Sequence, residues 1–296
     1  MLTIVLGFAT SLVYGFADFF GAIASKRISA VLVTFLSGVT GLLFLLSLSP
    51  ALGASFDPQT MFWGIASGIA SAVAMSCLYA SLAIGPISIV SPLGAVVSAI
   101  VPAIVGFFLG DRFSALGWVA IAVILVAVVL VGFIPGDDVR LPSSRGLLLG
   151  VAAGAGIGIV LICLNAAPHE SGLGPVILLR GVSASLLGLT MIVRQLSKRG
   201  QSEAGKSREP LFAKNLPVKF WAAVAVAGLF DSSANVFFLL ASRVPGGTLT
   251  VVSVLTALYP LGTIILARVF LKEKIALVQQ LGILLALGGS ALLALA

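Results

Sequence analysis

The chain has 296 residues, of which 59% are hydrophobic and only 9% are charged, and its formal net charge is +7. Soluble proteins are about 25% charged, so this composition excludes a water-soluble globule. The most charged stretch, residues 194–219, is too short to bury a hydrophobic core of its own. We therefore expect an integral membrane protein whose function is built inside the bilayer.

Ten apolar runs, separated by charges, prolines and glycines, divide the sequence. A spanning helix needs about 20 apolar residues, whereas the strands of membrane β-barrels alternate between apolar and polar residues. Because only helices and closed barrels satisfy their backbone in lipid, we predict an all-α integral membrane protein with ten transmembrane helices. The predicted spans are residues 3–24, 28–48, 61–84, 87–109, 113–133, 145–167, 173–193, 218–241, 247–271 and 275–295.

The sequence matches itself when it is shifted along its own length. Early in each half the shift is 143 residues, which aligns Leu6-Gly7 with Leu149-Gly150; later it is 162 residues, which aligns Asp111-Arg112 with Glu273-Lys274. We predict that residues 1–135 and 145–296, the second carrying the basic loop 194–219, are two copies of one five-helix unit. Because five is odd, the second copy enters the membrane from the opposite side. Two inverted repeats of this kind are typical of transporters.

The basic residues predict the orientation of the helices. The connections after the odd-numbered spans hold 14 Lys and Arg residues, whereas the other side holds only Arg112 and Arg243. Basic loops face the cytoplasm, so we expect both termini outside and the loop 194–219 in the cytoplasm of a protein of the cell membrane. Contact of this loop with anionic lipid is an alternative role, and we expect no nucleic-acid partner.

Each predicted half closes with a similar motif. The first reads ASLAIGPISIVSPL from Ala80 and then LGDR from Leu109; the second reads GGTLTVVSVLTALYP from Gly246 and then FLKEK from Phe270. These motifs resemble the EamA family of the drug/metabolite transporter superfamily, and the resemblance covers essentially the whole chain. It implies a ten-helix secondary carrier, often an exporter of amino acids, metabolites or drugs. In that family both termini usually face the cytoplasm, opposite to the orientation that the basic residues indicate.

Three ionisable residues, Asp18, Arg180 and Asp231, lie within predicted spans, where charged groups are costly and usually functional. Arg180 and Asp231 both lie about 10 Å from the outer surface by residue count, so we predict that they pair, with Asn235 one turn further on the same face. One interpretation is a purely structural ion pair. The other is that Arg180 binds a substrate carboxylate or phosphate and that Asp231 or Asp18 exchanges a proton.

Small and polar residues form a stripe on three predicted helices, and these stripes are candidate walls of a central cavity. The alternative is close helix packing, with the hydroxyl groups bonded to their own helices. We expect Pro92, Pro102 and Pro260 to break the helices locally. The stripes consist of Gly7, Ser11, Tyr14, Asp18, Gly21 and Ser25; of Ser88, Ser91, Ala95, Ser98 and Pro102; and of Thr250, Ser253, Ala257 and Pro260.

Tyr14 and Tyr259 are further binding candidates, with aromatic packing as the alternative. His169 is the only histidine and falls in a short connection, so we predict no metal site. The sequence shows no His-bearing motif, Gly-rich phosphate loop or ATP-hydrolysing module, so we predict no cofactor and no catalytic residue. The leading interpretation is a secondary transporter that exports a small molecule, such as an amino acid or a drug-like compound, with the lipid bilayer and protons as its other partners. The alternatives are a membrane scaffold or sensor and an intramembrane enzyme. We expect a monomer, with a dimer as the alternative.

Overall fold

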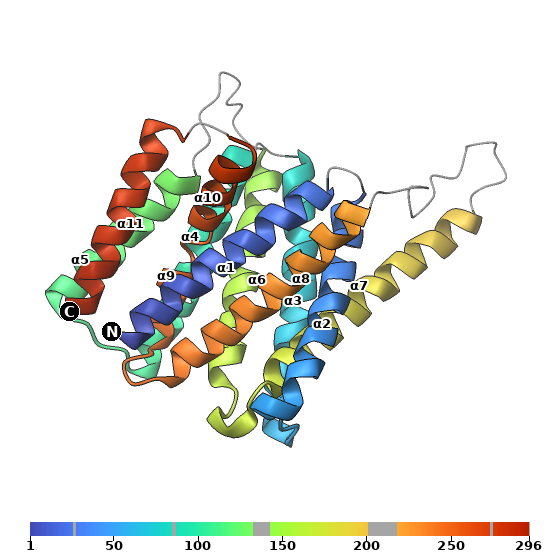
Figure 1. The fold of residues 1–296 in the computed structure, drawn as a ribbon, viewed down its shortest axis with the longest axis horizontal. Helices are drawn as coiled ribbons and strands as arrows, with labels where there is room; N and C mark the ends of the chain where they lie inside the picture. Colours follow the sequence, from blue (N-terminus) through green and yellow to red (C-terminus); the bar gives the residue numbers. More distant parts are fainter. Residues whose placement is uncertain (26–27, 85–86, 133–142, 201–217, 273–274, 296) are drawn as a thin grey trace.

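The computed structural model describes residues 1–296 except 26–27, 85–86, 133–142, 201–217, 273–274 and 296 (Figure 1). In the described part the chain is helical, and its strand-like pairing is limited to an isolated bridge between Ala54 and Gly172. The helices are α1 (Leu2–Ser25), α2 (Ala30–Leu52), α3 (Pro58–Ile84), α4 (Ile87–Leu109), α5 (Ala115–Gly132), α6 (Ser144–Ala166), the 3-10 helix η1 (His169–Ser171), α7 (Gly174–Gly200), α8 (Val218–Arg243), α9 (Leu249–Thr256), α10 (Pro260–Phe270) and α11 (Leu277–Leu295).

Length and hydropathy identify the membrane spans. Over the described residues, eight segments are long and apolar enough to cross a bilayer, and two shorter apolar helices, Leu93–Leu109 and Leu277–Leu293, accompany them. Large apolar side chains such as Leu43, Phe108 and Leu148 are exposed on the outside of the bundle, where lipid would cover them. The chain is therefore a multi-pass integral membrane protein with an all-helical fold, as its sequence predicts.

The predicted span 247–271 is not one continuous helix. The structure divides it into α9 and α10, which are joined at Ala257–Tyr259 by a tight turn with backbone bonds such as Tyr259 N–H to Thr256 C=O, 3.1 Å. Pro260 begins α10 and has no N–H group with which to continue the backbone hydrogen bonding of α9. The predicted break at Pro260 is thus confirmed. The breaks predicted at Pro92 and Pro102 are wrong, because α4 runs without interruption through both.

Helices that are far apart in the sequence pack against one another. The pairs α1 with α8 and α3 with α6 are the most extensive, and α2 packs against both α7 and α8. The pair α5 and α11 lies at one edge of the bundle, opposite the long α7 (Figure 1). The centre of the bundle is therefore formed by α1, α3, α6 and α8, and any ionisable group on their inner faces is removed from lipid.

One end of the bundle is held together by polar contacts between connections. Arg243, at the end of α8, donates from Nη2 to the Pro168 carbonyl at 3.0 Å. In the α2–α3 connection, Asp57 accepts bonds from the Thr60 hydroxyl and from backbone N–H groups of the first turn of α3. The Thr60 hydroxyl bond, above all, lowers the pKa of Asp57 below its ordinary value. This cap is therefore complete at neutral pH and is lost only as the pH falls through that lowered pKa.

Candidate functional site

The centre of the candidate site is an ion pair between α7 and α8. Arg180 Nη1 lies 2.6 Å from Asp231 Oδ2, and the two side chains are 8% and 32% exposed. Asn235, one turn after Asp231, donates from Nδ2 to the Asp231 backbone carbonyl at 2.8 Å. The ion pair confirms the prediction, made from their equal depth, that Arg180 and Asp231 meet.

The guanidinium group of Arg180 uses only part of its hydrogen-bonding capacity. Its Nε and Nη2 atoms are buried and have no hydrogen-bond partner among the described residues. Unpaired buried donors cost about 1–3 kcal/mol each. Arg180 is therefore a buried cation with two donors to spare, next to a carboxylate that is partly accessible.

Three further predicted residues lie around this pair. Tyr14 of α1 interacts electrostatically with both members of the ion pair and with Asp18. Asp18 interacts in turn with Asp231 and with Tyr259. Asp18 is exposed, and the described part of the chain offers it no ion-pair partner. Asp18, Asp231 and Arg180 together thus carry two carboxylates and one cation, so one added proton would bring their formal charge to zero.

The helix α2 packs against both helices of the ion pair. A Cβ atom added at Gly41 would meet the Ser232 hydroxyl and the Gly228 carbonyl of α8, and one added at Gly38 would lie 3.5 Å from Cβ of Ala184 on α7. The helix α2 therefore lies against both α7 and α8 close to the turn that carries Asp231. The absence of a side chain at Gly41 permits the close approach of α2 to α8, whereas the contact of Gly38 with α7 is at an ordinary van der Waals distance.

A second close crossing positions α1 against the break between α9 and α10. The Thr263 hydroxyl of α10 donates to the Gly15 carbonyl of α1 at 3.0 Å. A Cβ atom added at Gly15 would meet the backbone of Tyr259, Gly262 and Thr263. Because Gly15 lies between Tyr14 and Asp18, this crossing fixes the register of α1 that brings Asp18 near Tyr259.

Gly15→Ala should destabilise the protein by about 1–3 kcal/mol, because the new methyl group meets backbone atoms that cannot rotate away. Gly21→Ala, six residues along the same helix, is the matched control, since an added Cβ there has no atom within 4 Å among the described residues. Thermal unfolding in detergent measures both variants. Equal melting temperatures would contradict the close crossing at Gly15.

The polar stripes are mostly packing surfaces. The Ser11 and Ser98 hydroxyls bond to carbonyls of their own helices, and Gly7 lies against Leu255 of α9. Ser253 is buried, and its hydroxyl has no partner among the described residues. Ser91 lies on α4, but its side chain is outside the described part of the structure. The packing interpretation therefore accounts for Gly7, Ser11 and Ser98 and leaves Ser253 as a candidate.

Aromatic side chains next to the acids were not predicted as part of the site. Phe230 stacks on Phe20 with ring centroids 6.0 Å apart and meets Phe16 edge-on at 5.7 Å. Phe16 and Phe20 lie four residues apart, on either side of Asp18, and Phe230 directly precedes Asp231. The available signal was the i, i+4 spacing of Phe16 and Phe20, which places both rings on one face of α1, opposite Asp18. These rings thus form an aromatic contact between α1 and α8, on a different face of α1 from Asp18.

No group of three or more His, Cys, Asp or Glu residues that could hold a metal ion occurs in the ranges that the structure describes. The single histidine, His169, is exposed in η1, between α6 and α7. The candidate site brings together a guanidinium, two carboxylates, an amide and two phenols.

Comparisons with known proteins give a family and a fold. The model of the EamA-like transporter family matches residues 1–133 and 144–295. A solved crystal structure of a protein matches with a TM-score of 0.73 at 15% sequence identity, covering 99% of this chain and 98% of that chain. The comparison with curated proteins gave no significant match.

Proposed function

Since the chain belongs to the EamA-like transporter family, whose members are membrane transporters and not enzymes, we propose that it is a secondary active transporter that exports a small metabolite across the cell membrane. The observation that carries this proposal is the buried Arg180–Asp231 pair with the exposed carboxylate of Asp18 beside it. Charged groups inside a membrane protein usually mark substrate or ion pathways.

Ten spans in two inverted repeats would supply the moving parts. The family model matches twice, once in each half. The helix neighbours also agree with two equivalent halves: α1 packs on α8 as α6 packs on α3, and α2 packs on α8 as α7 packs on α3. Rocking one half against the other would open the central cluster first to one side of the membrane and then to the other. In this proposal the transporter works as a monomer.

The residues of the cluster have separate roles in this mechanism. Arg180 binds a carboxylate or phosphate of the substrate through its free Nε and Nη2 groups, which can donate to two oxygens of the anion. Asp18 carries the proton, because it is exposed and is not in the ion pair, whereas Asp231 holds Arg180 in place. Tyr14, Tyr259 and Asn235 complete the polar lining. Export of substrate is then coupled to entry of a proton.

Proteoliposomes that contain the purified protein test this function. Vesicles that are acidic inside should accumulate anionic or zwitterionic compounds from a pooled panel of labelled amino acids, organic acids and amines, because outward proton flow drives the exchange. Mass spectrometry reads the accumulated compounds. Asp231→Asn should abolish accumulation. Uptake that is the same with and without the pH gradient would contradict proton coupling. Accumulation of amines alone would contradict the role of Arg180 in binding an anionic group.

A further inference from the structure

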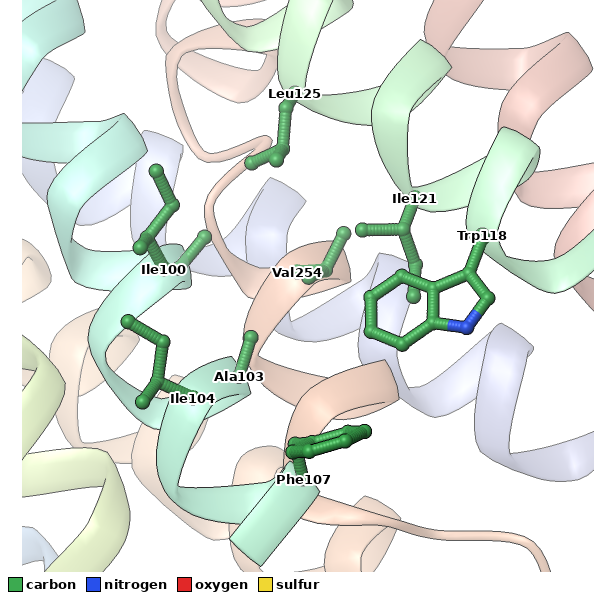
Figure 2. A pocket seen from close by; sticks show the side chains of 9 residues that line it. Ile100, Ala103, Ile104, Phe107, Trp118, Ile121, Leu125 and Val254 are labelled. Atoms are coloured by element: carbon green, nitrogen blue, oxygen red, sulfur yellow. The ribbon is translucent and has the colours of Figure 1, made fainter. Parts of the chain in front are cut away.

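A hollow lies away from the charged cluster, on the surface that faces the membrane. It is an apolar cavity of about 480 Å³ between α4, α5 and α9. Figure 2 shows Ile100, Ala103 and Ile104 of α4 facing Trp118, Ile121 and Leu125 of α5 across an open space. The volume lies in the range of small-molecule pockets, about 300–1,000 Å³. Those pockets, however, contain a few placed polar groups, and the walls here are apolar throughout.

The cavity is open toward lipid. Ile100, Ile104, Phe107 and Trp118, which line it, are among the exposed apolar residues of the bundle. On α4 the lining extends from Ala99 to Phe107, about 12 Å along the helix axis at 1.5 Å per residue. The hollow is therefore an elongated groove that runs from the α4–α5 connection toward the middle of the membrane. An acyl chain has the right shape and chemistry to fill it.

A cation lies at the end of the groove nearest the connection. The guanidinium carbon of Arg112 lies 5.1 Å from the ring centre of Phe107, a lining residue. Arg112 is exposed, and its Nη1 donates to the carbonyls of Phe107 and Asp111 at 3.0 Å. The Asp111 carboxylate is engaged elsewhere, since its Oδ2 accepts from the Thr250 N–H of α9 at 3.0 Å. The hydrogen bonds of Arg112 thus go to backbone carbonyls through Nη1, and its exposed guanidinium has no carboxylate bound to it among the described residues.

We propose that this groove binds an anionic phospholipid, with one acyl chain between α4 and α5 and the phosphate on Arg112. The apolar walls account for the chain, and the cation at the mouth accounts for the headgroup. An attached lipid would fill the space between the α5–α11 pair and the rest of the bundle, where α5 packs only modestly against α4 and α9. This inference concerns a second site and does not depend on the transport substrate.

Trp118 reports occupancy of the groove directly. A variant with Trp63→Phe and Trp221→Phe leaves Trp118 as the only tryptophan. It is reconstituted into phosphatidylcholine vesicles containing increasing amounts of brominated phosphatidylglycerol or of brominated phosphatidylcholine, whose acyl chains quench tryptophan fluorescence. We expect phosphatidylglycerol to bind about fivefold more tightly, the contribution of one basic side chain to binding an acidic lipid. Equal quenching by the two lipids would overturn the proposal.

Variants test binding of the lipid headgroup and binding of the acyl chain separately. Arg112→Gln should make the two lipids equivalent, and Arg112→Lys should preserve the preference because it keeps the charge. Ala103→Phe fills the groove and should reduce quenching by both lipids, whereas Val126→Phe, at an exposed position of α5 outside the lining, should not. Retained preference in Arg112→Gln, or unchanged quenching in Ala103→Phe, would exclude a lipid bound in this way.

Discussion

Asp231→Asn should destabilise the protein more than Arg180→Gln, by about 3–5 kcal/mol against about 1–3 kcal/mol. The asymmetry follows from exposure, since Arg180 is 8% exposed and Asp231 is 32% exposed. Loss of Asp231 leaves a buried cation without a counter-charge, whereas loss of Arg180 leaves a carboxylate that water can still reach. Thermal or denaturant unfolding in detergent measures both differences.

The double variant Arg180→Gln/Asp231→Asn distinguishes a structural pair from a functional one. Without either charge the desolvation penalty disappears, so stability should recover by about 0.5–3 kcal/mol relative to the sum of the single variants. Transport should nevertheless remain lost, because the anion site has gone. A double variant that is stable and still transports at the normal rate would mean that the pair only holds α7 and α8 together.

The depth of the charged residues could be predicted from the sequence, because rise per residue in a helix is constant. Counting residues along two predicted spans placed Arg180 and Asp231 at one level, and the structure confirms their pairing. The direction in which a side chain points around its helix depends on tertiary packing. The contact of Phe230 with Phe16 and Phe20 therefore could not be derived by counting.

Pro92, Pro102 and Pro260, which lie within predicted spans, show that the presence of proline alone does not predict a break in a helix. All three were expected to break their helices, yet only Pro260 does so. Pro102 lies within α4, and a Cβ atom added at Gly158 of α6 would lie 3.0 Å from its ring, so a neighbouring helix packs close against it. At Pro260 the close crossing with Gly15 holds the chain after the turn instead. The same residue type thus interrupts one span and is accommodated within another.

Asp18→Asn should abolish accumulation driven by a pH gradient while leaving exchange of substrate across the membrane intact. The reason is the charge balance of the cluster, which holds two carboxylates and one guanidinium, with Asp231 paired to Arg180 and Asp18 interacting with Asp231. In our proposal a proton on Asp18 neutralises this excess negative charge and lets the protein reorient without substrate. Asparagine mimics the protonated acid permanently, so the variant can reorient but can no longer couple that step to proton flow.

Two assays on the same proteoliposomes separate these steps. Counterflow, in which unlabelled substrate inside exchanges for labelled substrate outside, should continue in Asp18→Asn, whereas accumulation in acid-loaded vesicles should fall to the level of empty vesicles. Asp18→Glu keeps an ionisable group at the same place and should retain part of the accumulation. If Asp18→Asn accumulates substrate normally, the proton is carried elsewhere, and Asp231→Asn, tested in the same two assays, becomes the discriminating variant. Loss of counterflow as well would place Asp18 in substrate binding, because a residue needed only for coupling is not required for exchange.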